Sequence, residues 1–289
     1  MSGSENGPDA PGPGGTGPSD PAALVDLHSH LVPAVDDGAR TIDDAIEGIG
    51  RMVERGVRNI VTTPHLSATV TLKPSRLAAA LEPVDQAFAA LSDRVAERFP
   101  EIELGRGHEI LLDVPDPDLS DSRLWLGKVP VVLVEWPGLQ FPPGTPRVLD
   151  EMVRGGIRPM VAHPERYRVH NQRLTTPGEW REAGAWLQVN YGSVVGRYGP
   201  RARAHALTLL ERGWVDCFAS DFHGRAHLRL YIRECRELFM KMDHGEAWNL
   251  LTAVNPERIR RGEDPLAVPP VSIPIGVVER IRTLFGSIR

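Results

Sequence analysis

Seven short apolar runs alternate with helical patterns along this chain, and that alternation constrains its fold more than any other feature. Each run is short and mostly apolar, as in strands of a parallel sheet that is covered on both faces. The runs span residues 24–28, 58–63, 102–109, 129–135, 157–162, 185–190 and 215–220. The pattern predicts an α/β fold, a distorted TIM-like (β/α)7 barrel closed by a seventh strand instead of an eighth.

Helical patterns lie between most of the predicted strands. The clearest one starts at Thr41, where Asp44 three residues later predicts a capping box, and Gly56 is a plausible stop. Its apolar side chains recur at helical spacing, which predicts one buried face. The other predicted helices cover residues 74–98, 146–154, 200–212 and 227–242.

The chain is predicted to have one folded domain with an extension at each end. Residues 1–22 are rich in Gly and Pro and are predicted to form a disordered tail. Residues 23–265 hold the barrel, and residues 266–289 form a C-terminal extension with a short amphipathic helix over 275–288. We expect that helix to pack on the barrel or on a partner subunit, since its three arginines allow only weak attraction to an anionic membrane.

Composition excludes several classes of protein. The 289 residues include 33 basic and 38 acidic ones, and the net charge of −5 argues against general nucleic-acid binding. No apolar run approaches the ~20 residues of a membrane span, and the first residues do not resemble a signal peptide, so a cytoplasmic location is expected. Cys217 and Cys235 are too few for a disulfide framework. Neither is followed six residues later by Arg, which argues against a cysteine-based tyrosine phosphatase.

Six of the seven predicted strands end in a histidine or a carboxylate. In a barrel these ends converge on one rim, and His28 and His30, two residues apart, leave their strand on the same side. One such residue is usually a capping or surface residue, but six together favour a metal centre. The candidate ligands are His28, His30, Asp37, His65, Glu109, Glu135, His163, Asp221 and His223.

Nine ligands are too many for one tetrahedral ion, so two or three ions bridged by carboxylates are predicted. Imidazole and carboxylate ligands without thiolate suit manganese, iron or zinc. Clustered divalent ions lower the pKa of a shared water towards ~7 and hold the oxygens of a phosphoryl group. The pattern therefore predicts phosphoester hydrolysis, with attack of a metal-activated hydroxide on phosphorus.

An anionic substrate also requires a cation that is not a metal ligand. Arg166 is the best placed, because it follows His163 by three residues in a His-Pro-Glu-Arg turn. Arg225 and Arg229, just beyond the Asp-Phe-His sequence at 221–223, are weaker candidates for binding substrate phosphate.

These motifs resemble the polymerase and histidinol phosphatase (PHP) family of metal-dependent phosphoesterases. The closest resemblance is to its manganese-dependent protein-tyrosine phosphatase branch, the CpsB/CapC-like proteins found with bacterial capsule and exopolysaccharide genes. The Asp-Asp-Gly ending of the first motif is specific to that branch. The matching segments are residues 26–40, 62–65, 162–167, 188–190, 219–223 and 255–258.

The resemblance implies a site with three manganese ions bridged by Glu109. It places His28, His30 and Asp221 around one ion. It places His65, Glu135 and His163 around others, and completes the third ion with Asp37 and His223. It also implies that Arg166 binds phosphate and that Arg166, Asp37 and His223 are the catalytic residues. The chain departs from the family at Leu66, where a second histidine is common.

The leading hypothesis is a protein-tyrosine phosphatase that acts on the phosphotyrosine cluster of a polysaccharide-export kinase. The same metal set would also serve a small-molecule phosphatase, acting on histidinol phosphate or a sugar phosphate, or a nuclease, which the net acidity disfavours. A third possibility is a non-enzymatic metal-binding regulatory module. The sequence leaves the oligomeric state open.

Overall fold

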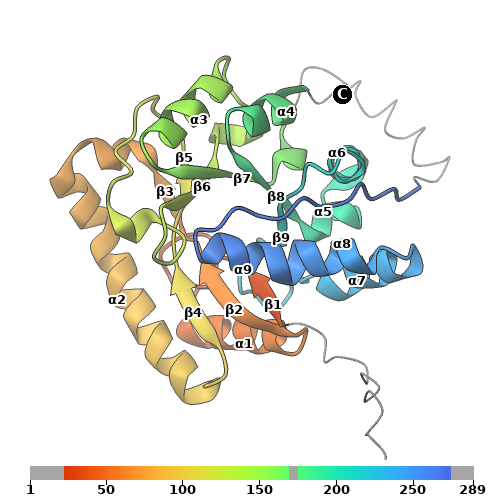
Figure 1. The fold of residues 1–289 in the computed structure, drawn as a ribbon. Helices are drawn as coiled ribbons and strands as arrows, with labels where there is room; N and C mark the ends of the chain where they lie inside the picture. The colour runs from red at the N-terminus through yellow and green to blue at the C-terminus, as the bar shows by residue number, and fades with distance from the viewer. Residues whose placement is uncertain (1–22, 169–174, 275–289) are drawn as a thin grey trace, which may run out of the picture.

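The structure is a computed structural model that describes residues 23–168 and 175–274, and in these ranges it has two parallel sheets (Figure 1). One sheet has the strand order β1-β2-β4 and the other the order β3-β5-β6-β7-β8-β9. The strands are β1 Leu24–Asp26, β2 Val57–Thr62, β3 His65–Ser67, β4 Glu103–Arg106, β5 Glu109–Leu111, β6 Val131–Glu135, β7 Arg158–Ala162, β8 Trp186–Asn190 and β9 Cys217–Ala219.

The two sheets join into one distorted barrel of seven staves. Two staves are broken in the middle: β2 resumes as β3, and β4 resumes as β5. The seam on the other side is closed by a bridge between Ser29 and Phe222 and by the Asp221 N–H, which donates to the His28 carbonyl at 2.9 Å. The predicted (β/α)7 barrel is therefore confirmed.

The single strand predicted over 102–109 is wrong in detail, and β3 was not predicted. Pro64 follows β2 and has no N–H to donate, so the sheet ladder stops there. Because β4 pairs with β2 and β5 pairs with β3, the neighbouring stave breaks at the same level. Backbone bonds from Gly107 to Thr62 and from Glu109 to Pro64 span the break.

The predicted helices are present, with shifted ends. At the first helix Thr41 accepts from the Asp44 N–H, and the Asp44 carboxylate accepts from the Thr41 N–H, which confirms the capping box. The helix predicted from residue 227 begins only at Ile232. The described helices are α1 Ile42–Val53, α2 Pro74–Arg98, α3 Thr145–Arg154, α4 Thr175–Glu182, α5 Tyr191–Val194, α6 Gly199–Glu211, α7 Ile232–Lys241, α8 Gly245–Asn249 and α9 Asn255–Arg260.

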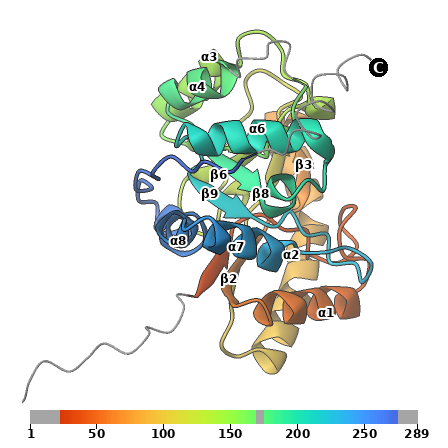
Figure 2. The ribbon, with the colours of Figure 1, turned by 90° about the vertical axis from the view of Figure 1, so that its right-hand side faces the viewer.

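Apolar side chains form two clusters that separate the inside of the barrel from its outer layer. Leu133 belongs to the smaller cluster, while its neighbours Val132 and Val134 belong to the larger one, as the alternation of a strand requires. The smaller cluster also contains Cys217, whose Sγ lies 3.7 Å from the Met160 Sδ, as expected for a core cysteine. Figure 2 shows α6 and α7 outside β8 and β9, where they cover the larger cluster.

The described part of the C-terminal extension runs in extended form across the barrel. Val268, Val271 and Ile273 are buried, and the Val271 N–H donates to the Leu210 carbonyl at 3.0 Å. The Asn255 side chain pairs with both backbone groups of Leu266. The tail at 1–22 and the helix predicted over 275–288 lie outside the described residues.

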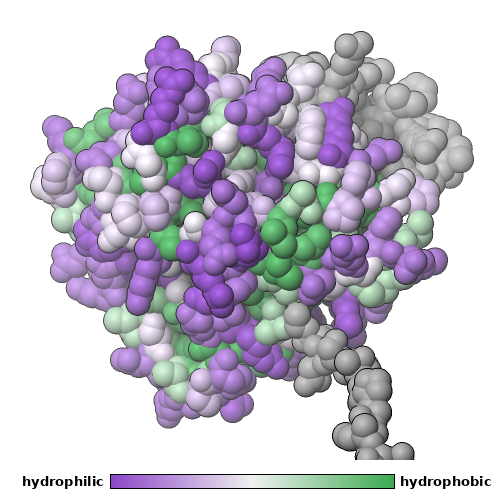
Figure 3. Space-filling model, viewed as in Figure 1, coloured by the Kyte–Doolittle hydropathy of each residue, from purple (hydrophilic) through white to green (hydrophobic). Residues whose placement is uncertain are grey.

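The described helices do not include a membrane-spanning one. Among residues 23–168 and 175–274 no helix is long and apolar enough to cross a bilayer. The face in Figure 3 is largely hydrophilic, with small hydrophobic areas scattered between the polar side chains.

Candidate metal centre

All nine predicted ligands come together at the carboxyl ends of the strands. His65 and Glu109 lie just after the ends of β2 and β4, at the breaks where β3 and β5 begin. Glu135 ends β6, and the others follow β1, β7 and β9 or lie in the loop before α1. Their nitrogen and oxygen atoms fall into groups within 4.8 Å of one another. The groups are His30-Asp37-His65-His223, His28-His163-Asp221, His28-His30-Glu109 and His65-Glu109-Glu135.

The group of His28, His30 and Glu109 has the spacing of ligands around one ion. The two Nε2 atoms are 3.3 Å apart, and the Glu109 Oε2 lies 3.2 Å from the first and 3.3 Å from the second. Two ligands that each bind an ion at about 2.1 Å, at a tetrahedral or right angle, lie about 3.0–3.4 Å apart. Oε2 is buried and has no hydrogen bond of normal geometry among the described residues, so these three residues fit a metal ion.

Glu109 is the centre of the cluster. Besides His28 and His30, its Oε2 lies 3.2 Å from the His65 Nδ1, and its Oε1 lies 3.0 Å from the His163 Nε2. The two oxygens therefore face four imidazoles from three segments of the chain. This is the placement that a bridging carboxylate requires.

A more open group lies at the edge of the cluster. The Asp37 Oδ1 lies 3.4 Å from the His223 Nε2 and 3.5 Å from the His65 Nε2. The side chains of Asp37 and His65 are 66% and 38% exposed. The His30 ring stacks on the His223 ring, and His30 belongs to this group as well as to the group of His28 and Glu109. The family resemblance assigned His30 to one ion only.

The buried imidazoles of His28 and His30 are oriented from behind. The His30 Nδ1 is 2.7 Å from the Asp36 carboxylate, and the His28 Nδ1 is 2.9 Å from the Gln188 amide oxygen. Such partners fix the tautomer and direct the Nε2 lone pair inward. A Cβ at Gly38 would lie 2.2 Å from the His30 carbonyl, so the Asp-Asp-Gly turn needs glycine there to bring Asp36 to His30.

The sequence pattern does not predict Asp36 and Gln188 as site residues. Asp36 stands beside the predicted ligand Asp37, and Gln188 opens the Gln-Val-Asn segment at a strand end. Their presence in the matching motifs was the available signal. Their role as hydrogen-bond partners depends on contacts between distant segments.

The backbone is strained at two of the candidate ligands. His163 and Asp221 have φ values of +34° and +49°, in the left-handed region that side chains other than glycine rarely adopt. Strain of this kind concentrates at functional sites, where the surrounding structure holds it in place. Asp221 is held by the Asn190 amide, which donates to its Oδ2 at 2.8 Å.

Within the cluster, imidazoles and carboxylates offset the effect of burial on one another's pKa. Burial would raise the pKa of Glu109, but the imidazoles of His28 and His163 hold it well below its usual value. Burial would lower the pKa of His28, but the carboxylates of Glu109 and Asp221 raise it to about 9. Burial and the charge of Glu109 raise the pKa of Glu135 to about 8. A proton on His28 supplies positive charge beside the buried carboxylates, and a proton on Glu135 removes one negative charge from the cluster.

The three candidate arginines lie in different surroundings. Arg166 is directed at the cluster, and its Nη1 donates to the Asp221 Oδ2 at 2.7 Å. Arg225 donates to the carbonyls of Asp37 and Gly38, so it binds the loop that carries Asp37. Arg229 is largely exposed and forms an ion pair with Glu234 at 2.9 Å.

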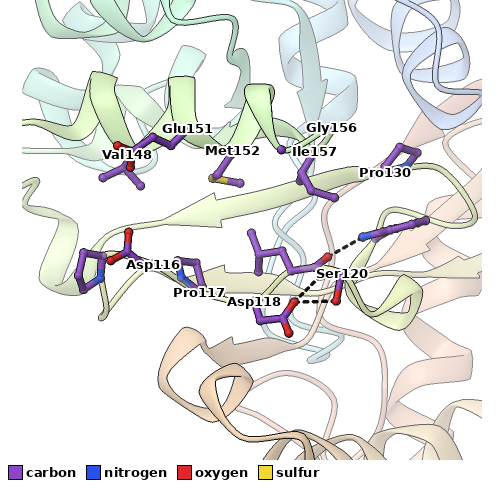
Figure 4. A pocket seen from close by; sticks show the side chains of 14 residues that line it. Asp116, Pro117, Asp118, Ser120, Pro130, Val148, Glu151, Met152, Gly156 and Ile157 are labelled. Atoms are coloured by element: carbon purple, nitrogen blue, oxygen red, sulfur yellow. Dashed lines mark hydrogen bonds between the residues drawn. The ribbon is translucent and has the colours of Figure 1, made fainter.

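A cavity of about 680 Å³ lies away from this cluster (Figure 4). Val148, Glu151 and Met152 of α3 line one side, and the loop of Asp116 and Asp118 lines the other. None of the nine candidate ligands lines it. The cavity is therefore separate from the candidate metal centre.

Fold and site together define a class of protein: a parallel α/β barrel with a His and carboxylate cluster that can hold several metal ions. Residues 24–261 match the family described as capsular polysaccharide synthesis, CpsB/CapC. The chain belongs to this family, which confirms the resemblance inferred from the motifs.

Named relatives agree with this assignment. The chain is 29% identical over 265 residues to the tyrosine-protein phosphatase YwqE of Bacillus subtilis (strain 168), covering 91% of this chain and 99% of the relative. It is 27% identical over 203 residues to the putative tyrosine-protein phosphatase CapC of Staphylococcus aureus, covering 70% and 77%.

A solved structure has the same fold. It belongs to the crystal structures of YwqE from Bacillus subtilis and CpsB from Streptococcus pneumoniae, described as unique metal-dependent tyrosine phosphatases. The TM-score is 0.72 and the identity 27%, covering 87% of this chain and all of that one.

Proposed function

We propose that this protein is a metal-dependent phosphomonoester hydrolase that removes phosphate from phosphotyrosine in proteins. The observation that carries the proposal is the arrangement of four imidazoles around the two oxygens of the buried Glu109. The family and the named phosphatase relatives support the same activity.

The nine candidate ligands would hold two or three ions, with Mn²⁺ as our choice and iron or zinc as alternatives for the same donors. Bound divalent ions would lower the pKa of a water molecule and neutralise charge on the phosphate. The protein's part is to hold the ligands in place: Asp36 and Gln188 fix His30 and His28, and Asn190 fixes Asp221.

Arg166 would bind the non-bridging oxygens of the phosphate. One of its N–H groups donates to Asp221, which ties the guanidinium to the ligand cluster. A guanidinium has five N–H donors, so the others are available to phosphate oxygens. Its charge would stabilise the transition state more than the ground state if phosphate charge shifts towards it.

Asp37 and His223 would act where substrate enters. Asp37 is the most exposed of the nine candidate ligands, and His223 lies 3.4 Å from it. The open edge gives access to a side chain on a protein surface, which favours a phosphoprotein over a small enclosed metabolite. The tyrosyl oxygen, with a pKa of about 10, needs less help from a proton donor than an aliphatic alkoxide.

The physiological substrate that we propose is the phosphotyrosine cluster of a polysaccharide-export kinase. The capsular polysaccharide description of the family supports this partner. A small-molecule phosphatase acting on histidinol phosphate or a sugar phosphate is the second candidate, since the same ligands would serve it.

Hydrolysis of four substrates by the full chain, each with added manganese, tests the proposal. The substrates are a phosphotyrosine peptide, p-nitrophenyl phosphate, histidinol phosphate and a sugar phosphate. We expect the two aryl phosphates to have the highest kcat/KM and a chelator to stop their hydrolysis. Preference for histidinol phosphate or the sugar phosphate would overturn the choice of substrate, and activity that survives complete metal removal would overturn the mechanism.

A further inference from the structure

Tyr198 covers one side of the Arg166 guanidinium. The Arg166 Cζ lies 4.5 Å from the centre of the Tyr198 ring, well within the range of a cation–π contact. Tyr198 is 37% exposed and is one of four large apolar side chains that are exposed in the described part of the chain. The ring is therefore at the surface and in contact with the proposed phosphate-binding residue.

The local fold brings the ring to this position. Tyr198 stands between α5 and α6, directly after Arg197, whose Cζ lies 5.9 Å from the same ring centre. A Cβ at Gly192 would lie 3.2 Å from the Tyr198 Cε2 and 3.2 Å from the Arg197 Cβ. The close approach of this loop to the end of β8 therefore depends on the absence of a side chain at Gly192.

The contact between Arg166 and Asp221 does not fix the guanidinium by itself. Among residues 23–168 and 175–274, the hydrogen bond from the Arg166 guanidinium runs from Nη1 to Oδ2, and Asp221 Oδ1 instead faces His28 and His30 at 3.6 and 3.5 Å. A guanidinium held by a single hydrogen bond can still turn about that bond, unlike one held by a bidentate pair. An aromatic ring over its face restricts that rotation.

We propose that Tyr198 is a positioning residue, which keeps the plane of the Arg166 guanidinium fixed so that its remaining N–H donors meet the oxygens of a bound phosphate. The inference rests on the proposed function. The ring performs this role, because it lies over the guanidinium, whereas the hydroxyl faces the Asn190 side chain.

The first test compares single variants of the full chain on p-nitrophenyl phosphate with manganese. Tyr198→Leu removes the aromatic face and should lower kcat/KM about tenfold, within the range of a partly desolvated cation–π contact. The inhibition constant of inorganic phosphate should rise by a similar factor, whereas bound manganese should not change. Tyr198→Phe keeps the ring and should stay within about twofold of the unmodified protein.

Tyr231→Leu is the matched control. The Tyr231 ring also faces Gly192, at 3.4 Å from the position of the added Cβ, but its cationic neighbour is Arg229 at 5.7 Å. We expect this variant to keep its kcat/KM and its inhibition by phosphate. An effect as large as that of Tyr198→Leu would mean that loosening the loop is enough, and the inference would be wrong.

A double-mutant cycle with Arg166→Ala decides whether Tyr198 acts through Arg166. If it does, Tyr198→Leu should change kcat/KM less than about twofold when Arg166 is already absent. Additive losses, or a Tyr198→Phe variant as impaired as Tyr198→Leu, would overturn the inference. Failure of the unmodified protein to hydrolyse any phosphomonoester would count against the proposed function itself, so the two failures are distinguishable.

Discussion

The metal cluster has two halves in very different surroundings. His28, His30, Glu109, His163 and Asp221 form a buried half, in which each residue is at most 7% exposed. Asp37, His65 and His223 form a rim half, in contact with solvent. Glu135, the ninth candidate ligand, lies between the halves and faces His163 of one and His65 of the other. The two halves form one site, because His30 of the buried half also belongs to the group of Asp37, His65 and His223. They differ in how their side chains are held in place and in how far solvent reaches them.

The halves also differ in what holds their side chains. In the buried half, His28, His30 and Asp221 have polar partners behind them in Gln188, Asp36 and Asn190. In the rim half, the His223 Nδ1 lies 2.9 Å from the Asp221 carbonyl, but the Asp37 carboxylate meets only the imidazoles of His65 and His223 among the described residues. Preorganised ligands bind an ion more tightly, because less ordering remains to be done on binding. We therefore expect the buried half to hold its ions tightly and the rim half to hold its ion more weakly, where substrate enters.

Removal of two buried ligands should have the largest effect on turnover. We expect the double variant His28→Ala, His30→Ala to lose hydrolysis of p-nitrophenyl phosphate, because two of the three nitrogens that face Glu109 Oε2 disappear. Single changes of Glu109 or His163 to Ala should also abolish it. The fold should survive, since the apolar clusters are untouched, and circular dichroism with metal analysis checks this.

His227→Ala is the control for the histidine variants, because His227 is exposed and lies outside the cluster. It should keep full activity and metal content. A double His28, His30 variant that retains more than a small fraction of turnover at matched manganese would contradict the multinuclear mechanism.

Arg166→Ala tests the phosphate contact that neither half of the cluster supplies. We expect a loss of roughly 10²-fold in kcat/KM, as for removal of one donor to a charged transition state. Bound manganese should change little, and Arg166→Lys should recover only part of the activity, because a point charge does not replace a planar fork. Equal losses of metal and turnover would make Arg166 a structural residue.

Asp36 and Asp37 are adjacent in sequence, yet they belong to different halves. Asp36→Asn should weaken the tightly held metal by about 10- to 100-fold, because it removes the carboxylate behind His30. Asp37→Asn should raise the manganese concentration needed for half activity, with recovery at high manganese. Activity titrated against manganese distinguishes them, with the exposed Asp93→Asn as control; identical curves for both variants would remove the distinction between the halves.

The sequence predicted the barrel and the gathering of nine candidate ligands at one rim, because both depend on local patterns. Strand ends carry the ligands, and parallel strands bring their carboxyl ends to one rim regardless of the helix details. The break at Pro64, by contrast, depends on how two staves pair. The sequence did not predict α4, because that segment has no strong apolar periodicity. The contacts of Gln188 with His28 and of Tyr198 with Arg166 join segments far apart in the chain, so no spacing rule finds them.

Proton and metal binding should compete at the buried half. The pKa of His28 is raised to about 9 in the metal-free protein, so its proton stabilises the fold fully below about pH 6.5 and this contribution is lost as pH rises through 9. Manganese must displace that proton, so its apparent affinity should rise with pH over the same window, by up to about tenfold per unit for each proton displaced. The difference in melting temperature with and without manganese should therefore widen from pH 6.5 to 9, and a constant difference would contradict this linkage.

The C-terminal extension should matter least for turnover. Removal of residues 266–289 should leave manganese content and kcat/KM within about twofold, because the extension lies on Leu210 and Asn255 and not on the ligands. It should lower the free energy of unfolding by about 1–3 kcal/mol, since Val268, Val271 and Ile273 lose their burial and the ordering of that segment offsets part of the cost. Removal of only 275–289 separates this effect from that of the predicted helix. Thermal melts and sedimentation of both truncated proteins measure stability and oligomeric state. Flotation of the intact protein with anionic liposomes, lost when 275–289 is removed, would show that the predicted helix binds membrane and would overturn its expected packing on the barrel or on a partner subunit.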